Sequence, residues 1–144
     1  MLGRMTTLPH THSFRVYYDD TDAGGIVYYA NYFKFAERAR TEWLRTLGFE
    51  SGRLRATHHI LIVVKKAAAD YIAPARLDDG LVVETRLEQL GGSSMTLAQD
   101  VFRIHPDGVG RDPLCVMQII LVCVDATSGR PTRWPDPLRT AISG

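Results

Sequence analysis

The sequence has little cysteine, and its two cysteines are poorly placed for a disulfide framework. Cys115 and Cys123 lie eight residues apart inside one apolar run, which excludes a small scaffold held together by disulfides. The five histidines are scattered at spacings that match no tetrahedral ligand set, so no metal centre is expected. Both cysteines are interpreted as core residues.

Long apolar runs and a large net charge are also missing. No stretch approaches the roughly 20 residues of a membrane-spanning helix. Residues 1–12 hold no apolar signal-peptide core, so cytoplasmic residence is expected. A net charge of +1 gives no strong attraction to nucleic acid or anionic membrane. At 144 residues and 45% hydrophobic content, residues 1–144 are expected to form one domain with flexible ends at 1–11 and 138–144.

An amphipathic helix is predicted over residues 30–47. Its apolar residues recur every three or four positions, which aligns them on one helix face: Tyr32, Ala36, Ala39, Trp43 and Leu47. Asn31 is expected to cap the N-terminus, and Gly48 is expected to end the helix.

Strands are predicted on both sides of this helix. One short strand precedes it, and four follow a polar link at 50–57; the five expected strands cover 14–18, 60–71, 81–90, 94–105 and 114–124. The proline-rich tail at 128–137 is expected to leave the sheet edge. This pattern predicts an α+β domain whose curved antiparallel sheet wraps one helix. Because one helix cannot cover both faces of a sheet, a partner sheet or a homo-oligomer is expected.

The segment between the first strand and the helix carries the residues best suited to chemistry. Residues 18–32, YDDTDAGGIVYYANY, place three carboxylates and two adjacent glycines before the helix start. The first N–H groups of a helix have no partner inside it, and the helix dipole makes that end electropositive. Asp22 could therefore act as base or nucleophile beside donors for a carbonyl oxygen. Aspartate and glycine are also ordinary turn residues, so a structural turn is the alternative.

The chain resembles the hot-dog-fold acyl-CoA thioesterases over residues 14–134. The matching tracts are VYYDDTDAGGIVY at 16–28, Tyr32 with ERARTE at 37–42, and YIAPARLDD at 71–79. The branch it looks most like is the bacterial group associated with the Tol–Pal system, which is related to 4-hydroxybenzoyl-CoA thioesterase.

The resemblance implies a hot-dog fold, with five antiparallel strands around a long central helix, assembled as homodimers or homotetramers. It also implies hydrolysis of a small or medium acyl-CoA without metal or added cofactor, coenzyme A being part of the substrate. The family's catalytic aspartate maps onto Asp22, and its polarising backbone N–H maps near Tyr29. The residues predicted to bind substrate are Tyr18, Gly25, Ile26, Val27 and Tyr29.

Several alternatives stay open at this point. The Tol–Pal-associated branch often has a histidine at the position of Tyr29. This chain instead resembles the aromatic-acyl branch at that position, so an aromatic acyl-CoA thioesterase is one alternative. A non-catalytic module that binds acyl-CoA or acyl carrier protein is another, and a structural partner of envelope machinery is a third. A hot-dog dehydratase is disfavoured because the helix contains no histidine. The candidates for binding the phosphates of coenzyme A are Lys65, Lys66, Arg103, Arg130 and Arg133.

Overall fold

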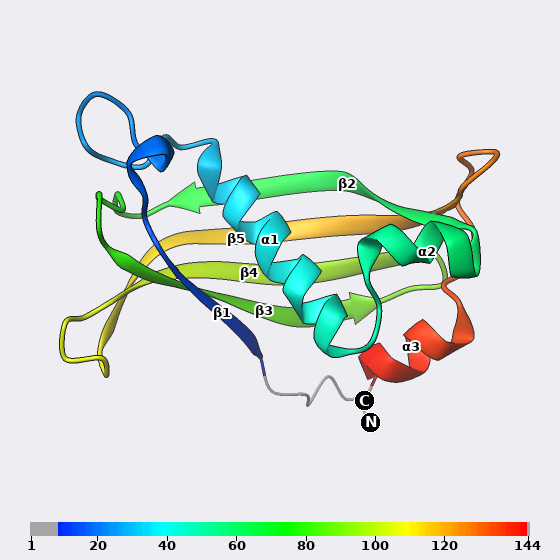
Figure 1. Cartoon of the computed structure of the whole chain (residues 1–144). Coiled ribbons are helices and arrows are strands. Elements are labelled where there is room, and N and C mark those ends of the chain that lie inside the picture. The colour runs from blue at the N-terminus through cyan, green and yellow to red at the C-terminus, as the bar shows by residue number, and fades with distance from the viewer. Residues whose placement is uncertain (1–8, 144) are drawn as a thin grey trace.

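The structure combines one long helix with a single antiparallel sheet (Figure 1). This computed structural model describes residues 9–143; of the ends expected to be flexible, residues 1–8 and 144 lie outside the described part. In chain order the elements are β1 (His10–Arg15), a 3-10 turn (Tyr18–Asp20), α1 (Asn31–Thr46), α2 (Ser51–His58), β2 (Ile60–Tyr71), β3 (Gly80–Leu90), β4 (Ser94–Ile104), β5 (Arg111–Asp125) and α3 (Asp136–Ser143).

The sheet has the strand order β1-β3-β4-β5-β2, and every neighbouring pair is antiparallel. The short β1 and the long β2 are therefore its two edges. In β3 the expected alternation is present, because Val83 and Thr85 are buried whereas Arg86 and Glu88 are exposed. All five expected strands exist, although β1 spans His10–Arg15 and so begins and ends earlier than the predicted 14–18, with Tyr18 in the 3-10 turn. The α+β prediction is confirmed.

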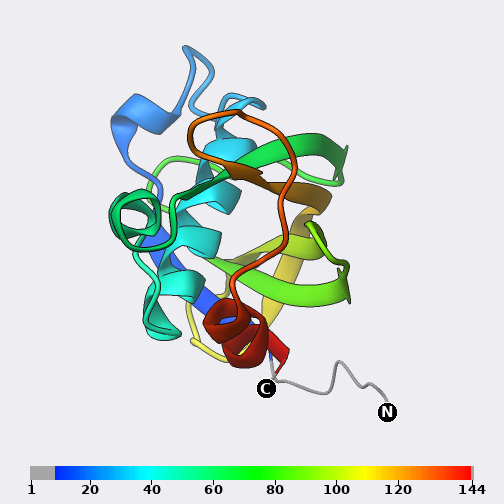
Figure 2. The same ribbon diagram turned by 90° about the vertical axis from the view of Figure 1, so that its right-hand side faces the viewer.

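The core lies between α1 and one face of the sheet (Figure 2). The buried residues of α1 are Tyr32, Phe35, Ala36, Ala39, Trp43 and Leu44. Gln99 of β4 is fully buried among these apolar side chains. Its Nε2 donates to the Ala36 carbonyl and to Thr85 Oγ1, both at 2.9 Å. These bonds satisfy the buried amide and join the helix to the sheet.

The C-terminal end of α1 follows the expected pattern. Gly48 adopts a φ of +92°, a left-handed conformation that favours glycine. Its N–H donates to the Arg45 carbonyl at 3.0 Å, and the Phe49 N–H donates to the Leu44 carbonyl at 2.9 Å. This pair of bonds is the Schellman arrangement, and the predicted helix stop is confirmed.

The chain after β5 differs from the expectation of a departing tail and a flexible end. Trp134 is buried, and its indole N–H donates to the Ser94 carbonyl at 3.0 Å. Most of the predicted flexible end at 138–144 instead belongs to α3, which buries Leu138 and Ile142 against the core. The short helix is ordered by this burial, a tertiary effect that a local sequence pattern does not report.

Two other predictions were also wrong for tertiary reasons. The polar link at 50–57 is helical, as α2, although Leu54 is its one buried residue among those whose side chains are described. Residues 10 and 11, assigned to a flexible N-terminal end, pair with Thr85 and Glu84 as part of β1. In both cases a neighbouring element fixes a segment whose own sequence is mostly polar.

Replacing Leu138 by alanine tests the docking of α3. Leu138 is fully buried, so Leu138→Ala is expected to lower the free energy of unfolding by about 2–4 kcal/mol through lost burial and a residual cavity. Urea denaturation measures this change. The exposed Thr140→Ala on the same helix is the control and should change stability by less than about 0.5 kcal/mol. Equal stability of the two variants would show that α3 is not docked.

Candidate functional site

The acidic loop between β1 and α1 is fixed at its distal end by contacts with the β2–β3 connection. Thr21 pairs with Val27 across the loop, and Ile26 pairs with Arg76 of the connection. The Val27 N–H donates to the Ala75 carbonyl at 2.9 Å. Two of the tracts that carry the family resemblance therefore meet in space, although they are far apart in the sequence.

Asp22 lies at the exposed tip of this loop, in a tight turn. Its Oδ1 accepts the Gly24 N–H at 2.8 Å, while its own N–H donates to the Ile26 carbonyl at 2.9 Å. A Cβ added at Gly24 would come within 3.3 Å of that Oδ1, and Gly25 has a φ of +79°. The paired glycines thus let the turn close around the carboxylate. Among the described residues, Oδ2 of Asp22 has no hydrogen-bond partner.

Asp20 supports the loop from inside. It is 7% exposed, and its Oδ2 accepts the Tyr17 N–H at 2.9 Å. Its main-chain carbonyl accepts the Tyr28 N–H at 3.2 Å and Asn31 Nδ2 at 2.8 Å. Asn31 is therefore not the predicted cap, because α1 begins at Asn31 itself, with Ala30 in the cap position. Its amide instead ties the helix start to the acidic loop.

Two successive peptide groups before α1 have engaged carbonyls and unengaged N–H groups. The Tyr28 carbonyl accepts the Asn31 N–H at 2.9 Å, and the Tyr29 carbonyl accepts both the Tyr71 hydroxyl at 3.2 Å and the Tyr32 N–H at 3.4 Å. Within residues 9–143, neither the Tyr29 N–H nor the Ala30 N–H has an acceptor. Such free donors at the positive end of a helix are suited to an oxygen that gains negative charge.

An apolar pocket of about 230 Å³ opens beside these donors. Its walls come from the acidic loop, α1, the end of β2 and the β2–β3 connection; the lining residues are Ile26, Val27, Tyr29, Tyr32, Tyr71, Ile72, Ala73 and Pro74. The Tyr71 ring contacts two other tyrosine rings edge-on, with its centroid 6.1 Å from Tyr29 and 5.5 Å from Tyr32. The pocket can hold a small apolar group next to a polarised carbonyl.

The structure brings together some of the predicted site residues and leaves others outside. Ile26, Val27 and Tyr29 line the pocket, whereas Tyr18 and Gly25 do not. Tyr18 lies in the 3-10 turn with 81% of its surface exposed. Asp22 is also outside the lining and is linked to it through the backbone bond to Ile26.

Sequence reasoning missed Tyr71 and Tyr32 as pocket residues. Tyr71 is the first residue of the matching tract at 71–79, and the sequence placed it only at the end of the predicted strand 60–71. Tyr32 was assigned to the apolar helix face, and it is indeed buried, but its hydroxyl also accepts the Ala75 N–H at 2.9 Å. The presence of an aromatic residue at the start of a tract shared with the family was the sequence signal that could have identified Tyr71 as a pocket residue.

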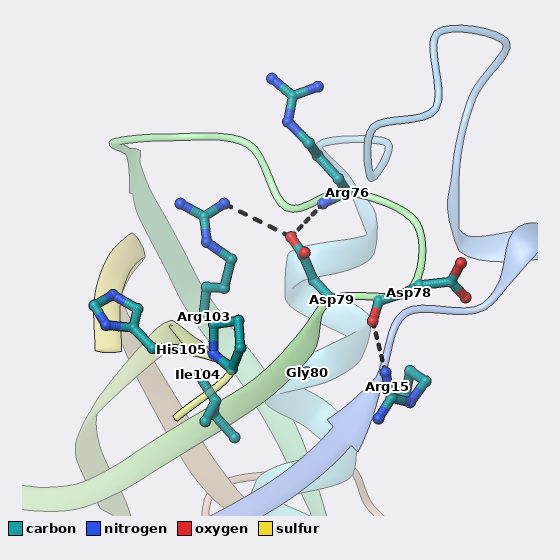
Figure 3. Close-up of a pocket in the computed structure, with 9 residues that line it drawn as sticks. Arg15, Arg76, Asp78, Asp79, Gly80, Arg103, Ile104 and His105 are labelled. Atoms are coloured by element: carbon teal, nitrogen blue, oxygen red, sulfur yellow. Dashed lines mark hydrogen bonds and ion pairs between the residues drawn. The ribbon is translucent and has the colours of Figure 1, made fainter. Parts of the chain in front are cut away.

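A larger groove, of about 780 Å³, runs between the β2–β3 connection and the β4–β5 hairpin (Figure 3). Figure 3 shows Asp79 between the Arg76 N–H at 2.8 Å and the Arg103 guanidinium at 3.6 Å. Arg103 also pairs with Asp112 at 3.1 Å. Because two carboxylates already meet its charge, Arg103 is a poor ligand for a phosphate. Its ion pairs instead connect the hairpin to the β2–β3 connection.

The cysteines offer no competing nucleophile. Burial raises the pKa of Cys115 to about 12 and that of Cys123 to about 11, so both stay protonated thiols near neutral pH. Across residues 9–143, no three His, Cys, Asp or Glu side chains are grouped as a metal site. In the same range, no helix has the length and hydropathy needed to cross a membrane.

Comparison with known families gives the class of the protein. The family model of the thioesterase-like superfamily matches residues 16–142. The chain belongs to this superfamily. Among solved structures, the 4-hydroxybenzoyl CoA thioesterase from Pseudomonas sp. strain CBS-3 is similar, with a TM-score of 0.84 at 22% identity, covering 94% of this chain and 99% of that one. The likeness confirms the hot-dog fold.

Individual relatives narrow the class. The chain is 40% identical over 128 residues to the acyl-CoA thioesterase YbgC of Haemophilus influenzae, covering 89% of this chain and 90% of that protein. It is also 40% identical over 121 residues to the acyl-CoA thioester hydrolase YbgC of Escherichia coli O157:H7, covering 84% and 86% respectively. The predicted membership of the acyl-CoA thioesterase family is therefore confirmed.

Proposed function

We propose that this protein, a member of a family of acyl-CoA thioester hydrolases, hydrolyses small or medium acyl-CoA thioesters to the free acid and coenzyme A. The observation that carries the proposal is the pair of unengaged N–H groups at Tyr29 and Ala30, between the Asp22 turn and an apolar pocket. Together these parts could hold an acyl group, polarise its carbonyl and supply a carboxylate.

In the proposed mechanism, the thioester carbonyl oxygen accepts the N–H groups at the start of α1. Negative charge grows on that oxygen as the carbonyl carbon is attacked, and the fixed donors stabilise it. Loss of one such donor costs on the order of 3 kcal/mol in a comparable acyl-transfer site. Because the thiolate of coenzyme A is a good leaving group, no strong general acid is required.

Asp22 is the proposed source of the attack. Its Oδ1 is held by the Gly24 N–H at 2.8 Å, which leaves Oδ2 available to bond carbon or to take a proton from water. As a nucleophile it would form an anhydride and expel the thiolate, and water would then hydrolyse the anhydride. As a general base it would activate water directly. Both routes use the same carboxylate oxygen.

The pocket supports a small acyl group. Its volume of about 230 Å³ is below the roughly 300–1,000 Å³ of pockets that hold drug-sized ligands. The rings of Tyr29, Tyr32 and Tyr71 favour the second candidate, an aromatic acyl group, because aromatic rings prefer edge-on contacts of this kind. Acyl carrier protein as the thiol carrier, and cytoplasmic residence, stay predictions from the sequence.

We also propose that two copies pair along β2, as the predicted homo-oligomer requires. This edge strand exposes Leu61, Val63, Val64 and Tyr71. In β2, Ala67 and Ala69 oppose buried residues of β5, whereas Lys66, Ala68 and Asp70 point to the other face. An antiparallel pair of β2 strands with its two-fold axis at Ala68 would place Lys66 opposite the partner's Asp70 twice. A tetramer would add a second contact between such dimers.

Replacing Asp22 by asparagine tests the proposed catalytic group. Asp22→Asn is expected to lower thioester turnover by at least about 100-fold, because an amide is neither base nor nucleophile here. Release of free thiol from acyl-CoA measures turnover, and thermal melting checks the fold. Asp19→Asn removes the same charge from an exposed neighbour and should keep the parent rate. Parent-like turnover by Asp22→Asn would reject the assignment.

A panel of substrates separates the aliphatic and aromatic alternatives. Given the pocket volume, the highest kcat/KM is expected with acyl groups of short or medium length and a clear fall with long chains. The panel contains acetyl-, butyryl-, hexanoyl-, palmitoyl- and benzoyl-CoA, with thiol release as the readout. A preference for benzoyl-CoA would favour the aromatic alternative, and saturable binding without thiol release would favour a binding module.

A charge exchange tests the proposed β2 pairing. Lys66→Asp would place like charges opposite each other at two positions and is expected to raise the dimer dissociation constant about tenfold. Lys66→Asp combined with Asp70→Lys restores opposite charges and should restore the parent constant. Sedimentation analysis measures self-association. If Lys66→Asp associates like the parent, or if the double variant is not rescued, the register is wrong.

A further inference from the structure

Tyr71 is the last residue of the edge strand β2, yet its side chain reaches the start of α1. Its hydroxyl donates to the Tyr29 carbonyl at 3.2 Å. Among the described residues, it is the one side chain that hydrogen-bonds the main chain of residues 28–30. The other bonds of this segment come from the backbone of Asp20 or from α1 itself. Tyr71 therefore connects strand β2, which lies outside the acidic loop, to the peptide group that carries the Ala30 N–H.

The geometry of the peptide group gives this bond a specific consequence. In a trans peptide the C=O and the N–H point in opposite directions, and the chain has no cis peptide bond among its described residues. The Tyr29 carbonyl and the Ala30 N–H belong to the same peptide group. This carbonyl accepts the Tyr32 N–H at 3.4 Å and the Tyr71 hydroxyl at 3.2 Å. The hydroxyl is the shorter of the two bonds and the one that comes from outside the helix. It therefore helps to fix the direction of the Ala30 N–H, and it also polarises the group in the same sense.

The Tyr71 hydroxyl is protonated and held in place. The ordinary tyrosine pKa already lies well above neutral pH, and burial, the largest cause, raises the pKa of the Tyr71 hydroxyl further. The ring is held edge-on against Tyr29 and Tyr32. Directly after Tyr71, the Ile72 N–H donates to the Leu114 carbonyl at 2.8 Å. The donor is thus anchored by both its ring and its backbone.

We propose that Tyr71 is a positioning residue that orients the main-chain donors at the start of α1 toward the substrate carbonyl. This inference rests on the proposed function, because it assigns those donors to the reacting thioester. It differs from a purely structural role, in which the ring alone would matter and the hydroxyl could be removed without effect on turnover.

Tyr71→Phe tests the proposal because it keeps the ring and removes the hydroxyl. The expected result is a fall in kcat of about tenfold, the effect of losing one modest hydrogen bond, with KM changed less than twofold. The melting temperature should stay close to that of the parent, since the ring contacts remain. Tyr17→Phe is the matched control, because Tyr17 is 67% exposed and does not line the pocket, and it should keep the parent kcat.

A second readout does not depend on turnover. The amide resonance of Ala30 should move in the NMR spectrum of Tyr71→Phe, since its peptide group loses a bond at the carbonyl, and should stay in place in Tyr17→Phe. An unmoved Ala30 resonance, or a parent-like kcat in Tyr71→Phe, would overturn the proposal. Parent-like turnover by Asp22→Asn, measured in parallel, would instead reject the catalytic assignment of Asp22 and leave these two readouts to decide the role of Tyr71.

Discussion

The candidate site depends on the hydrogen bonds that the carbonyl groups ahead of α1 accept. A helix start always leaves N–H groups without partners, but they are useful for binding only when their direction is fixed. Here Asp20 provides a carbonyl that holds both the Tyr28 N–H and the Asn31 amide. The next carbonyls are taken by the helix and by Tyr71. The unengaged donors are therefore a consequence of a rigid acidic loop, and the buried carboxylate of Asp20 is part of that rigidity.

The two aspartates of the DTD motif have different environments although they are two residues apart. Asp20 faces inward, and its Oδ2 accepts the Tyr17 N–H. Asp22 is exposed, with its Oδ1 bonded to the Gly24 N–H and its Oδ2 without a partner among residues 9–143. The difference arises from the 3-10 turn, which ends at Asp20 and changes the direction of the chain. An extended strand would have placed both side chains on the same side. The turn thus separates a supporting carboxylate from an exposed one.

The sequence predicted the architecture well because the strongest hydrophobic patterns belong to the longest helix and strands. Periodicity located α1 and the four strands after it, and Gly48 marked the helix end. The elements that were missed or misjudged, α2 and α3, are short and depend on burial of one or two side chains, such as Leu54 or Leu138. Likewise, the motif pointed to Asp22 and Tyr29 as candidate site residues, but the hydrogen bond from Tyr71 to the Tyr29 carbonyl depends on a tertiary contact between β2 and the segment before α1.

Strand β2 contains a β-bulge at Lys65. This bulge determines which face of the sheet each later residue of the strand occupies. Val64 pairs with Leu121 and Lys66 with Ile120, so Lys65 is an extra residue in the edge strand. Because side chains alternate with a period of two, one inserted residue reverses the facing of everything that follows. Without it, Asp70 would point toward the helix and Tyr71 would point away from it. A single unpaired residue, six positions earlier in the strand, thus decides that an aromatic hydroxyl and not a carboxylate meets the start of α1.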